Sequence, residues 1–295
     1  MFKGSYVALV TPFDEDNCVN FRVLGQLLDF HLRNKTDGLV ILGTTSESAT
    51  LSFEEEEMIA KFVVERVNKR IPVIIGSGSN NTKEAIWQSM RFEQMGADGL
   101  LVVTPYYNKC NDEGLYLHYK AISEAVNIPI ILYNVPSRTG TSISITNLTR
   151  LKELDNIVGL KEASGDISYL TQAARLADDG FAIYSGNDDL ILVALALGAS
   201  GVISVVANSY PQVIHNLCNA YFEGRIKEAQ SLQFAYLDLI NLMFIEVNPI
   251  PIKNALNYQG FKVGACRLPL AELSENNQIQ LRTRMDKVGY QTHES

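Results

Sequence analysis

One lysine in this sequence stands where burial makes a lysine costly. The run IVGLKEAS, which begins at Ile157, reads as a short buried strand, yet Lys161 interrupts its apolar residues. An ammonium group loses favourable hydration when it is buried, and burial therefore favours the neutral amine. A neutral amine condenses with a ketone to a Schiff base, which acts as an electron sink. Lys161 is thus a candidate catalytic nucleophile, and an anion-binding cation is the alternative.

Hydroxyl groups follow the apolar runs that precede Lys161. Tyr133 follows the apolar residues Ile130 to Leu132 in the run PIILYNVP. Four more hydroxyls lie at or just after two earlier runs: Thr44, Thr45, Tyr106 and Tyr107. Schiff-base chemistry needs groups that move protons, and tyrosine and threonine hydroxyls can relay them to water. Taken singly, each residue has an ordinary explanation in capping or packing. Together they favour an imine-forming lyase or aldolase.

Arg138 lies five residues after Tyr133, in the segment YNVPSRTG. A guanidinium group can bind a carboxylate through two parallel hydrogen bonds, so Arg138 is a candidate clamp for an acidic substrate. A surface ion pair is the alternative. Because the formal net charge is −8, acidic substrates would require such local cations.

The composition argues against several classes of function. The 295 residues are 46% hydrophobic and 20% charged, as in ordinary globular proteins, and the negative net charge argues against nucleic acid as the main partner. The cysteines and histidines show neither CxxC nor metal-ligand spacing: Cys18, Cys110, Cys218, Cys266, His31, His118, His215 and His293. We therefore expect no metal and no disulfide framework. No signal-peptide pattern or apolar run of membrane length occurs, so we expect a cytoplasmic protein without a membrane partner.

Eight short apolar runs recur along the chain. They begin at Ser5, Gly38, Pro72, Gly99, Pro129, Ile157, Phe181 and Gly201. Each is continuous and rich in Val and Ile, as expected for parallel strands buried on both faces. Helical patterns lie between them, one of which starts with a capping box of Ser52 and Glu55. The pattern predicts an α/β fold of the TIM (β/α)8-barrel type. A doubly wound sheet is the alternative, but no GxGxxG follows the first run.

After about Tyr210 the strand signal stops and the sequence reads as helical. We expect a barrel catalytic domain over residues 1–222 and a helical C-terminal extension over residues 223–295, packed on the barrel or on a neighbouring subunit.

The C-terminal ends of the strands form the reactive face of a TIM barrel. Alternation along a strand places Lys161 on the same face as Ile157 and Gly159, and Tyr133 on the same face as Ile131. If that face is the barrel interior, the amine and the phenol point into one cavity.

These residues occur in segments that resemble the dihydrodipicolinate synthase family, one of the pyruvate-dependent class I aldolases, which include N-acetylneuraminate lyase. The segments are ALVTPF, ILGTTSESATL, VTPYYN, YNVPSRTG, GLKEASGD, GVISVVAN and NPIPIK, and their order and spacing are typical of the family. The resemblance runs from about Gly4 to CRLPL near Leu268. It implies condensation of pyruvate with L-aspartate 4-semialdehyde to 4-hydroxy-tetrahydrodipicolinate, on the diaminopimelate route to lysine.

The resemblance implies a role for each matching position. Lys161 forms the imine with pyruvate, and Tyr133 donates and accepts protons. Thr44 completes a proton relay with Tyr107 of a neighbouring subunit, so a homotetramer built as a dimer of dimers is implied. The implied substrate-binding positions are Thr45 and Ile203 for pyruvate, Arg138 for the semialdehyde carboxylate, and Gly186. No cofactor is implied, because the lysine imine is itself the electron sink.

Two alternative functions remain at this point. One is an aldolase that cleaves a sugar-derived 2-keto acid, although the sugar-acid lyases generally lack an arginine at the position of Arg138. The other is a non-catalytic barrel that binds keto acids, which the presence of Lys161, Tyr133 and Thr44 disfavours.

Ser46 departs from the family pattern, which usually has glycine there. If the position needs positive φ, serine costs about 1 kcal/mol or more and shifts the binding site for the pyruvate carboxylate.

A second departure concerns inhibition by lysine. Family members that lysine inhibits bind it at a subunit interface, at positions that match Ser48, Ala49, Asn80, Glu84 and Tyr106. Histidines common in that site are replaced here by Phe53 and Glu56. Glu84 and Glu56 carry the charge to pair with the ammonium groups of lysine. Lysine inhibition is therefore a hypothesis, and an interface pocket without regulation is the alternative.

Overall fold

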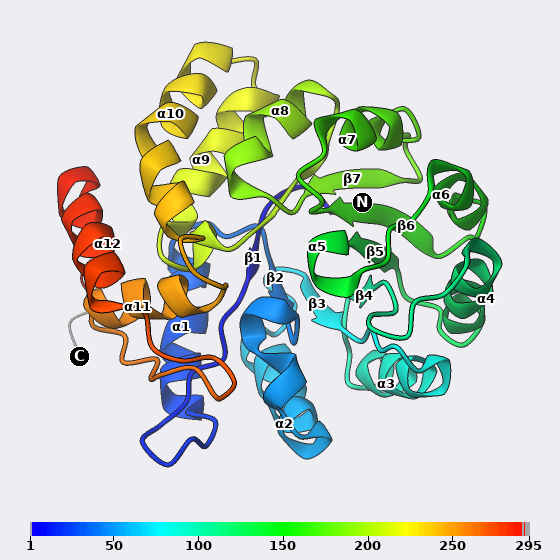
Figure 1. Cartoon of the computed structure of the whole chain (residues 1–295), viewed down its shortest axis with the longest axis horizontal. Coiled ribbons are helices and arrows are strands. Elements are labelled where there is room, and N and C mark those ends of the chain that lie inside the picture. The colour runs from blue at the N-terminus through cyan, green and yellow to red at the C-terminus, as the bar shows by residue number, and fades with distance from the viewer. Residues whose placement is uncertain (1, 291, 293–295) are drawn as a thin grey trace.

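The computed structural model describes residues 2–290 and 292, and at its centre lies a closed barrel of eight parallel strands (Figure 1). Each strand pairs with the next, and β8 pairs with β1. The strands are β1 (Gly4–Ala8), β2 (Gly38–Ile41), β3 (Val73–Gly76), β4 (Gly99–Val103), β5 (Ile130–Asn134), β6 (Ile157–Glu162), β7 (Ala182–Ser185) and β8 (Gly201–Ser204). The predicted TIM barrel is confirmed. His293, at the end of the expected extension, lies outside the described residues.

Helices surround the barrel (Figure 1). They are α1 (Phe21–Arg33), α2 (Phe53–Val67), α3 (Thr82–Gln94), α4 (Asp112–Ser123), α5 (Pro136–Thr139), α6 (Ile145–Lys152), α7 (Ile167–Ala174), α8 (Ile191–Ala196), α9 (Pro211–Phe222), α10 (Ile226–Leu242), α11 (Ile250–Tyr258) and α12 (Glu275–Val288). Short 3-10 turns are η1 (Thr44–Ser46), η2 (Ser48–Thr50), η3 (Asp188–Leu190) and η4 (Val206–Asn208). The predicted capping box at Ser52 and Glu55 is present at the start of α2.

The buried apolar side chains form two layers. Those inside the barrel form an inner cluster: Tyr6, Ala8, Val40, Ile74, Leu101, Ile131, Tyr133, Val135, Ala182, Tyr184 and Ile203. Their neighbours along each strand belong to a larger outer cluster that includes apolar side chains of the helices. Because successive strand residues point to opposite sides, both faces of each strand are buried, and this explains why the runs are continuously apolar.

The register between β5 and β6 shifts near the start of β6. Ile130 pairs with Ile157, but Ile131 pairs with Gly159, so Val158 is an extra residue in the ladder. Ile157 consequently packs in the outer cluster, whereas Val158 packs against the inner one. The expectation that Ile157 shares a face with Lys161 is wrong, because a bulge interrupts the alternation between them.

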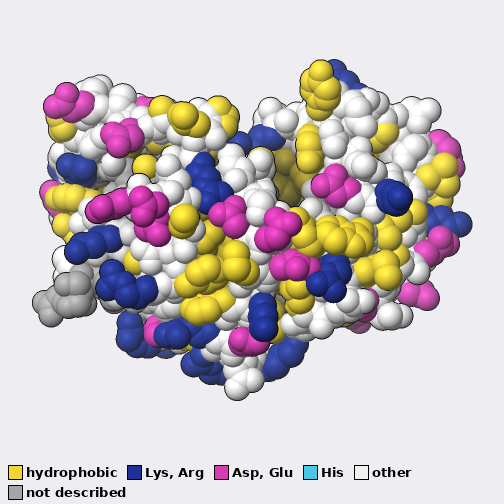
Figure 2. Space-filling model, turned by 90° about the horizontal axis from the view of Figure 1, so that it is seen from below, with side chains coloured by type: hydrophobic (Ala, Val, Ile, Leu, Met, Phe, Trp, Pro, Cys, Tyr) yellow, Lys and Arg dark blue, Asp and Glu magenta, His cyan; other side chains and the backbone are white. Residues whose placement is uncertain are grey.

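Large apolar side chains are exposed on α2 and α3. Met58 is 50% exposed, Trp87 48% and Met90 41%. Figure 2 views the molecule of Figure 1 from below and shows hydrophobic side chains gathered on that face. Exposed apolar patches of this kind are typical of contact surfaces between proteins.

The helices α10, α11 and α12 lie together at one side of the barrel (Figure 1). α10 packs against α9, and α12 packs against α10 and α11. α9 ends at Phe222, where the sequence analysis places the end of the catalytic domain. The division of the chain at that residue stays a prediction.

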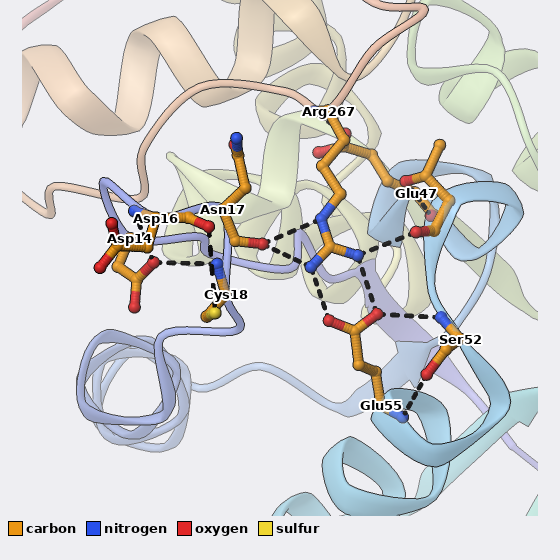
Figure 3. Close-up of polar contacts among 9 residues, drawn as sticks. Asp14, Asp16, Asn17, Cys18, Glu47, Ser52, Glu55 and Arg267 are labelled. Carbon is orange, nitrogen blue, oxygen red and sulfur yellow. Dashed lines mark hydrogen bonds and ion pairs between the residues drawn. The ribbon is translucent and has the colours of Figure 1, made fainter.

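Polar contacts join this C-terminal region to the turns that follow β2. Lys253 Nζ donates to Glu47 Oε1 at 2.6 Å, and these side chains are only 2% and 1% exposed. Burial lowers the pKa of Lys253, and the charge and hydrogen bond of Glu47 act in the opposite direction. The Arg267 guanidinium binds both carboxylate oxygens of Glu55, at 2.6 and 2.8 Å (Figure 3). The Arg267 backbone N–H donates to Glu47 Oε2 at 2.8 Å. The extension therefore holds the η1–η2 turns by charged contacts.

Within residues 2–290 and 292, no helix has the length and hydropathy needed to cross a membrane. In the same part of the chain, His, Cys, Asp and Glu side chains form no group of three that could hold a metal ion.

We predict that Lys253→Met lowers the free energy of unfolding by about 3–5 kcal/mol, because it leaves the Glu47 carboxylate buried without its cation. Urea denaturation at fixed protein concentration and pH 7 measures this. Lys61→Met is the matched control, since Lys61 lies 4.0 Å from Glu65 and both side chains are well exposed. It should change the free energy by less than about 1 kcal/mol. Equal effects of the two substitutions would contradict the prediction.

Candidate active site

Tyr133 and Lys161 lie side by side at the ends of neighbouring strands. Tyr133 of β5 pairs with Lys161 of β6. The Lys161 amine nitrogen lies 4.2 Å from the centre of the Tyr133 ring. Lys161 is 6% exposed and Tyr133 is 7% exposed, so both are almost fully removed from water. Tyr133 also shares the inner face with Ile131, as the sequence predicts. The amine and the phenol therefore meet inside the barrel at its C-terminal end.

Thr44 and Thr45 lie in η1, directly after β2. Thr45 is buried, and its hydroxyl oxygen accepts a hydrogen bond from Asn248 Nδ2 at 2.9 Å. Asn248 belongs to the loop between α10 and α11, so this contact joins the C-terminal region to the candidate site.

Ser46 is not strained. Positive φ occurs one residue later, at Glu47, with φ 58°. The buried Ser46 hydroxyl instead donates to the Leu9 carbonyl oxygen at 2.6 Å. The condition on which strain at Ser46 depends, a positive φ, is therefore not met, because the turn has its left-handed residue at Glu47.

A cavity of about 570 Å³ lies at the C-terminal ends of β2 to β5. Three of the predicted catalytic and substrate-binding residues line it: Thr44, Tyr133 and Arg138. Asn248 lines it as well. The other predicted catalytic and substrate-binding residues do not line the cavity: Lys161, Thr45, Ile203, Gly186 and Tyr107. Lys161 reaches the cavity wall through its contact with the Tyr133 ring.

Arg138 lies in α5, the short helix that follows β5. Arg138 is exposed, and its Nη2 donates to the backbone carbonyl oxygen of Asn248 at 3.2 Å. The guanidinium thus stands at the cavity wall with donors left for a ligand.

The ends of β6 and β7 are closely packed. The Gly186 N–H donates to the Glu162 carbonyl oxygen at 2.6 Å, and a Cβ at this position would lie 2.5 Å from Ala163 Cβ. Only glycine therefore allows this approach of the two strand ends. Ile203 is 1% exposed and belongs to the inner cluster.

Asp188 is a buried acid near Lys161 that sequence reasoning missed. Its carboxylate accepts hydrogen bonds from the Ser204 hydroxyl and from the Val205 N–H at 3.0 Å. Burial raises the pKa of Asp188 to about 6, although these hydrogen bonds and the charge of Lys161 act in the opposite direction. The signal in the sequence is the pair of aspartates after the seventh apolar run.

Tyr107 is exposed, unlike the buried Lys161 and Tyr133. Its side chain is 90% exposed, and its backbone has φ 71°. In the described chain, no hydrogen bond joins Tyr107 to Thr44 or Tyr133. A single subunit therefore does not assemble the predicted relay.

The predicted lysine site occupies the other part of the same cavity. The lining includes Ser48, Ala49, Glu84 and Tyr106, together with Phe53 and Glu56. Asn80 does not line it, but its side chain donates to the Tyr106 carbonyl oxygen at 3.1 Å.

Two carboxyl groups face this part of the cavity. Burial, with the Glu84 charge as a smaller cause, raises the pKa of Glu56 to about 8. Ser79 donates to Glu84 at 2.9 Å, and the Phe53 and Trp87 rings pack 3.9 Å apart. The arrangement combines acidic groups with an apolar wall.

The closed barrel and the buried lysine at the end of its sixth strand place the chain among the (β/α)8-barrel enzymes. The model of the dihydrodipicolinate synthetase family matches residues 1–288, and the chain belongs to this family. The chain is 51% identical over 289 residues to the 4-hydroxy-tetrahydrodipicolinate synthase of Clostridium perfringens (strain 13 / Type A), covering 98% of this chain and 99% of that one.

Solved structures agree with this result. The dihydrodipicolinate synthase of Aquifex aeolicus superimposes with a TM-score of 0.96 at 42% identity, over 99% of this chain and 100% of that one. The chloride-inhibited dihydrodipicolinate synthase of Acinetobacter baumannii, complexed with pyruvate, also gives a TM-score of 0.96 at 42% identity, over 98% and 100% of the two chains.

We predict that Ser46→Ala lowers the free energy of unfolding by about 1 kcal/mol, because the Leu9 carbonyl oxygen loses its buried donor. Ser46→Gly should destabilise at least as much, since glycine also adds backbone freedom to the unfolded chain. Denaturant unfolding of both variants measures this. A more stable Ser46→Gly variant would show that the serine is strained after all.

Proposed function

We propose that the chain condenses pyruvate with L-aspartate 4-semialdehyde to 4-hydroxy-tetrahydrodipicolinate, through a Schiff base on Lys161. The observation that carries the proposed mechanism is the buried Lys161 amine, 4.2 Å from the Tyr133 ring centre at the end of neighbouring strands. The reaction belongs to the diaminopimelate route to lysine, as the names of the relatives support. The pyruvate in the Acinetobacter baumannii structure supports the first substrate.

In the proposed reaction the Lys161 amine attacks C2 of pyruvate, and loss of water from the carbinolamine gives the imine. Loss of a methyl proton then gives an enamine, whose carbon forms a bond to the aldehyde carbon of the semialdehyde. The amino group of the semialdehyde attacks the imine carbon, which closes the ring and releases the lysine amine. The imine takes up the electron pair when the methyl proton is lost, and the aldehyde oxygen takes it up when the carbon–carbon bond forms, so the proposed chemistry needs no cofactor.

Proton transfer in this scheme falls to Tyr133, whose ring already contacts the amine. Thr44 lines the same cavity and can pass protons onward. Tyr107 is 90% exposed, so it can complete the relay only in another copy of the chain. The exposed apolar residues of α2 and α3 support a subunit contact on that side. We therefore propose a homotetramer built as a dimer of dimers. We also propose that the protein acts in the cytoplasm.

Substrate binding is divided among four positions. Thr45 donates to the pyruvate carboxylate, and the Ile203 backbone lies against the bound pyruvate. Gly186 is assigned to substrate binding by the resemblance to the family, and its close approach to Ala163 leaves no space for a side chain there. Arg138, exposed at the cavity wall, binds the carboxylate of the semialdehyde.

Borohydride reduction in the presence of pyruvate should link pyruvate covalently to the wild-type chain, and Lys161→Ala should abolish the adduct. Mass spectrometry of the intact protein measures this. Arg138→Ala is the matched control, because it keeps the amine: it should retain the adduct but raise the KM for the semialdehyde about tenfold or more and lower turnover. An adduct of equal yield in Lys161→Ala would overturn the Schiff-base proposal.

Purified protein is tested first for pyruvate consumption with L-aspartate 4-semialdehyde and, separately, with N-acetylmannosamine. Turnover with the semialdehyde alone is the expected result. Turnover only with the sugar would make the chain a sugar-acid aldolase, and turnover with neither would favour a non-catalytic keto-acid barrel.

We also propose that L-lysine inhibits the enzyme by binding beside Glu84 and Glu56. The carboxyl groups and the apolar wall of Phe53 match the ammonium groups and the aliphatic stem of lysine. Glu56 replaces a histidine common in the family, so its protonation state bears directly on the charge that lysine meets.

Inhibition by L-lysine should strengthen as the pH rises from 7 towards 8.5. The pKa of Glu56 is about 8, so the carboxyl is mostly neutral below that pH and becomes an anion above it. Inhibition constants measured across this range should fall several-fold in the wild type and change much less in Glu56→Gln. Activity that stays flat under millimolar lysine at every pH would remove the inhibition proposal, and a pH-independent constant would remove the role of Glu56.

A further inference from the structure

Asn248 contacts residues that we assign to both substrates. It lies in the loop between α10 and α11 and lines the 570 Å³ cavity. Its side-chain Nδ2 donates to the hydroxyl oxygen of Thr45 at 2.9 Å. Its backbone carbonyl oxygen accepts a hydrogen bond from Arg138 Nη2 at 3.2 Å. One residue of the C-terminal region thus touches the group proposed for pyruvate and the group proposed for the semialdehyde.

The direction of the bond to Thr45 determines what the threonine can do. An amide NH₂ group only donates, so the Thr45 oxygen is the acceptor in this contact. The single hydroxyl proton of Thr45 then remains free to be donated. Within residues 2–290 and 292, the Thr45 hydroxyl has no other hydrogen-bond partner. A carboxylate only accepts, so it is complementary to a threonine held in this way.

Stability alone does not explain an asparagine here. Asn248 is 6% exposed, and its Oδ1 is buried with no hydrogen-bond partner in the described chain. Leaving a buried acceptor without a donor is costly, and an apolar side chain at the same place would avoid the cost. A functional requirement for the Nδ2 donor accounts for the residue better than packing does.

A second contact holds the same two chain segments together. Lys253, five residues after Asn248, pairs with Glu47, two residues after Thr45, and this ion pair is fully buried. With one contact from the loop and a second from the adjoining helix α11, the amide of Asn248 has a defined orientation against the Thr45 hydroxyl.

We propose that Asn248 is a positioning residue that holds Thr45 as a hydrogen-bond donor to the carboxylate of pyruvate, while its backbone carbonyl orients Arg138. The inference rests on the proposed function, because it assigns pyruvate to Thr45. It adds a residue of the C-terminal extension to the substrate-binding machinery of the barrel.

The test is Asn248→Asp, which preserves the side-chain shape but replaces the donor by an acceptor. The Thr45 proton is then donated to Asp, and a negative charge lies near the pyruvate carboxylate. The KM for pyruvate should rise about ten- to hundredfold. The KM for the semialdehyde should change less than about threefold, because the backbone carbonyl that contacts Arg138 remains.

A double-mutant comparison separates positioning from a structural role. In a Thr45→Val background the threonine hydroxyl is gone, so Asn248→Asp should raise the KM for pyruvate much less than in the wild type. Asn248→Ala, which removes the donor without adding charge, should raise that KM several-fold, and it serves as the test if the aspartate variant does not fold. Circular dichroism and thermal unfolding establish that each variant is folded.

An unchanged KM for pyruvate in the folded variants would overturn the proposal. An equal rise in both KM values, or effects that add fully in the Thr45→Val background, would likewise overturn it. If the wild-type chain consumes no semialdehyde, the proposed function fails. The role of Asn248 is then decided by the pyruvate concentration needed for half-maximal borohydride trapping, which should rise ten- to hundredfold in Asn248→Asp.

Discussion

The pairing of β5 with β6 is the constraint on which the candidate site depends. A parallel ladder fixes which residues stand opposite each other, and here it places the Tyr133 phenol beside the Lys161 amine. The bulge at Val158 resets the register before the ladder reaches these two residues. If residues 157–161 alternated strictly, Lys161 would share the outward face of Ile157 and point to the helical side of the strand. The position of the amine is therefore set by backbone hydrogen bonds rather than by its own side-chain contacts.

The turns after β2 depend on a different kind of interaction. Strand pairing ends at Ile41, and the following turns carry Thr44 and Thr45. Charged contacts from the C-terminal region hold this part of the chain: Lys253 pairs with Glu47 between the two turns, and Arg267 pairs with Glu55 at the start of α2. A buried ion pair is a weak source of net stability compared with apolar packing, but it tolerates little displacement of its partners. The barrel thus positions the lysine, and the extension positions the groups around it.

The barrel and its lysine were predictable because their signals are local. Eight continuous apolar runs are enough to predict parallel strands buried on both faces, and a lysine within such a run is conspicuous. The resemblance of the motifs to a known family supplied the remaining roles. Those roles at individual positions, including Ile203 and Gly186, stay proposals that the kinetic experiments test.

What the sequence did not predict arises from long-range contacts and backbone geometry. The Ile157 assignment failed because a bulge leaves no mark in an apolar pattern. Whether Ser46 is strained could not be predicted, because the composition of a turn does not say which residue is left-handed. Asn248 was missed because its partner, Thr45, lies 203 residues away in the sequence. Contacts over such separations appear only when the chain has folded.

The shared cavity has a consequence for inhibitor chemistry. Arg138 lines the same cavity as Glu56 and Glu84, so a guanidinium and two carboxyl groups share one cavity. An elongated zwitterion with an acidic head for the arginine and a basic tail for the glutamates would contact both kinds of group at once. Because Glu56 replaces a histidine common at this position in the family, the basic tail would also distinguish this enzyme from many of its relatives.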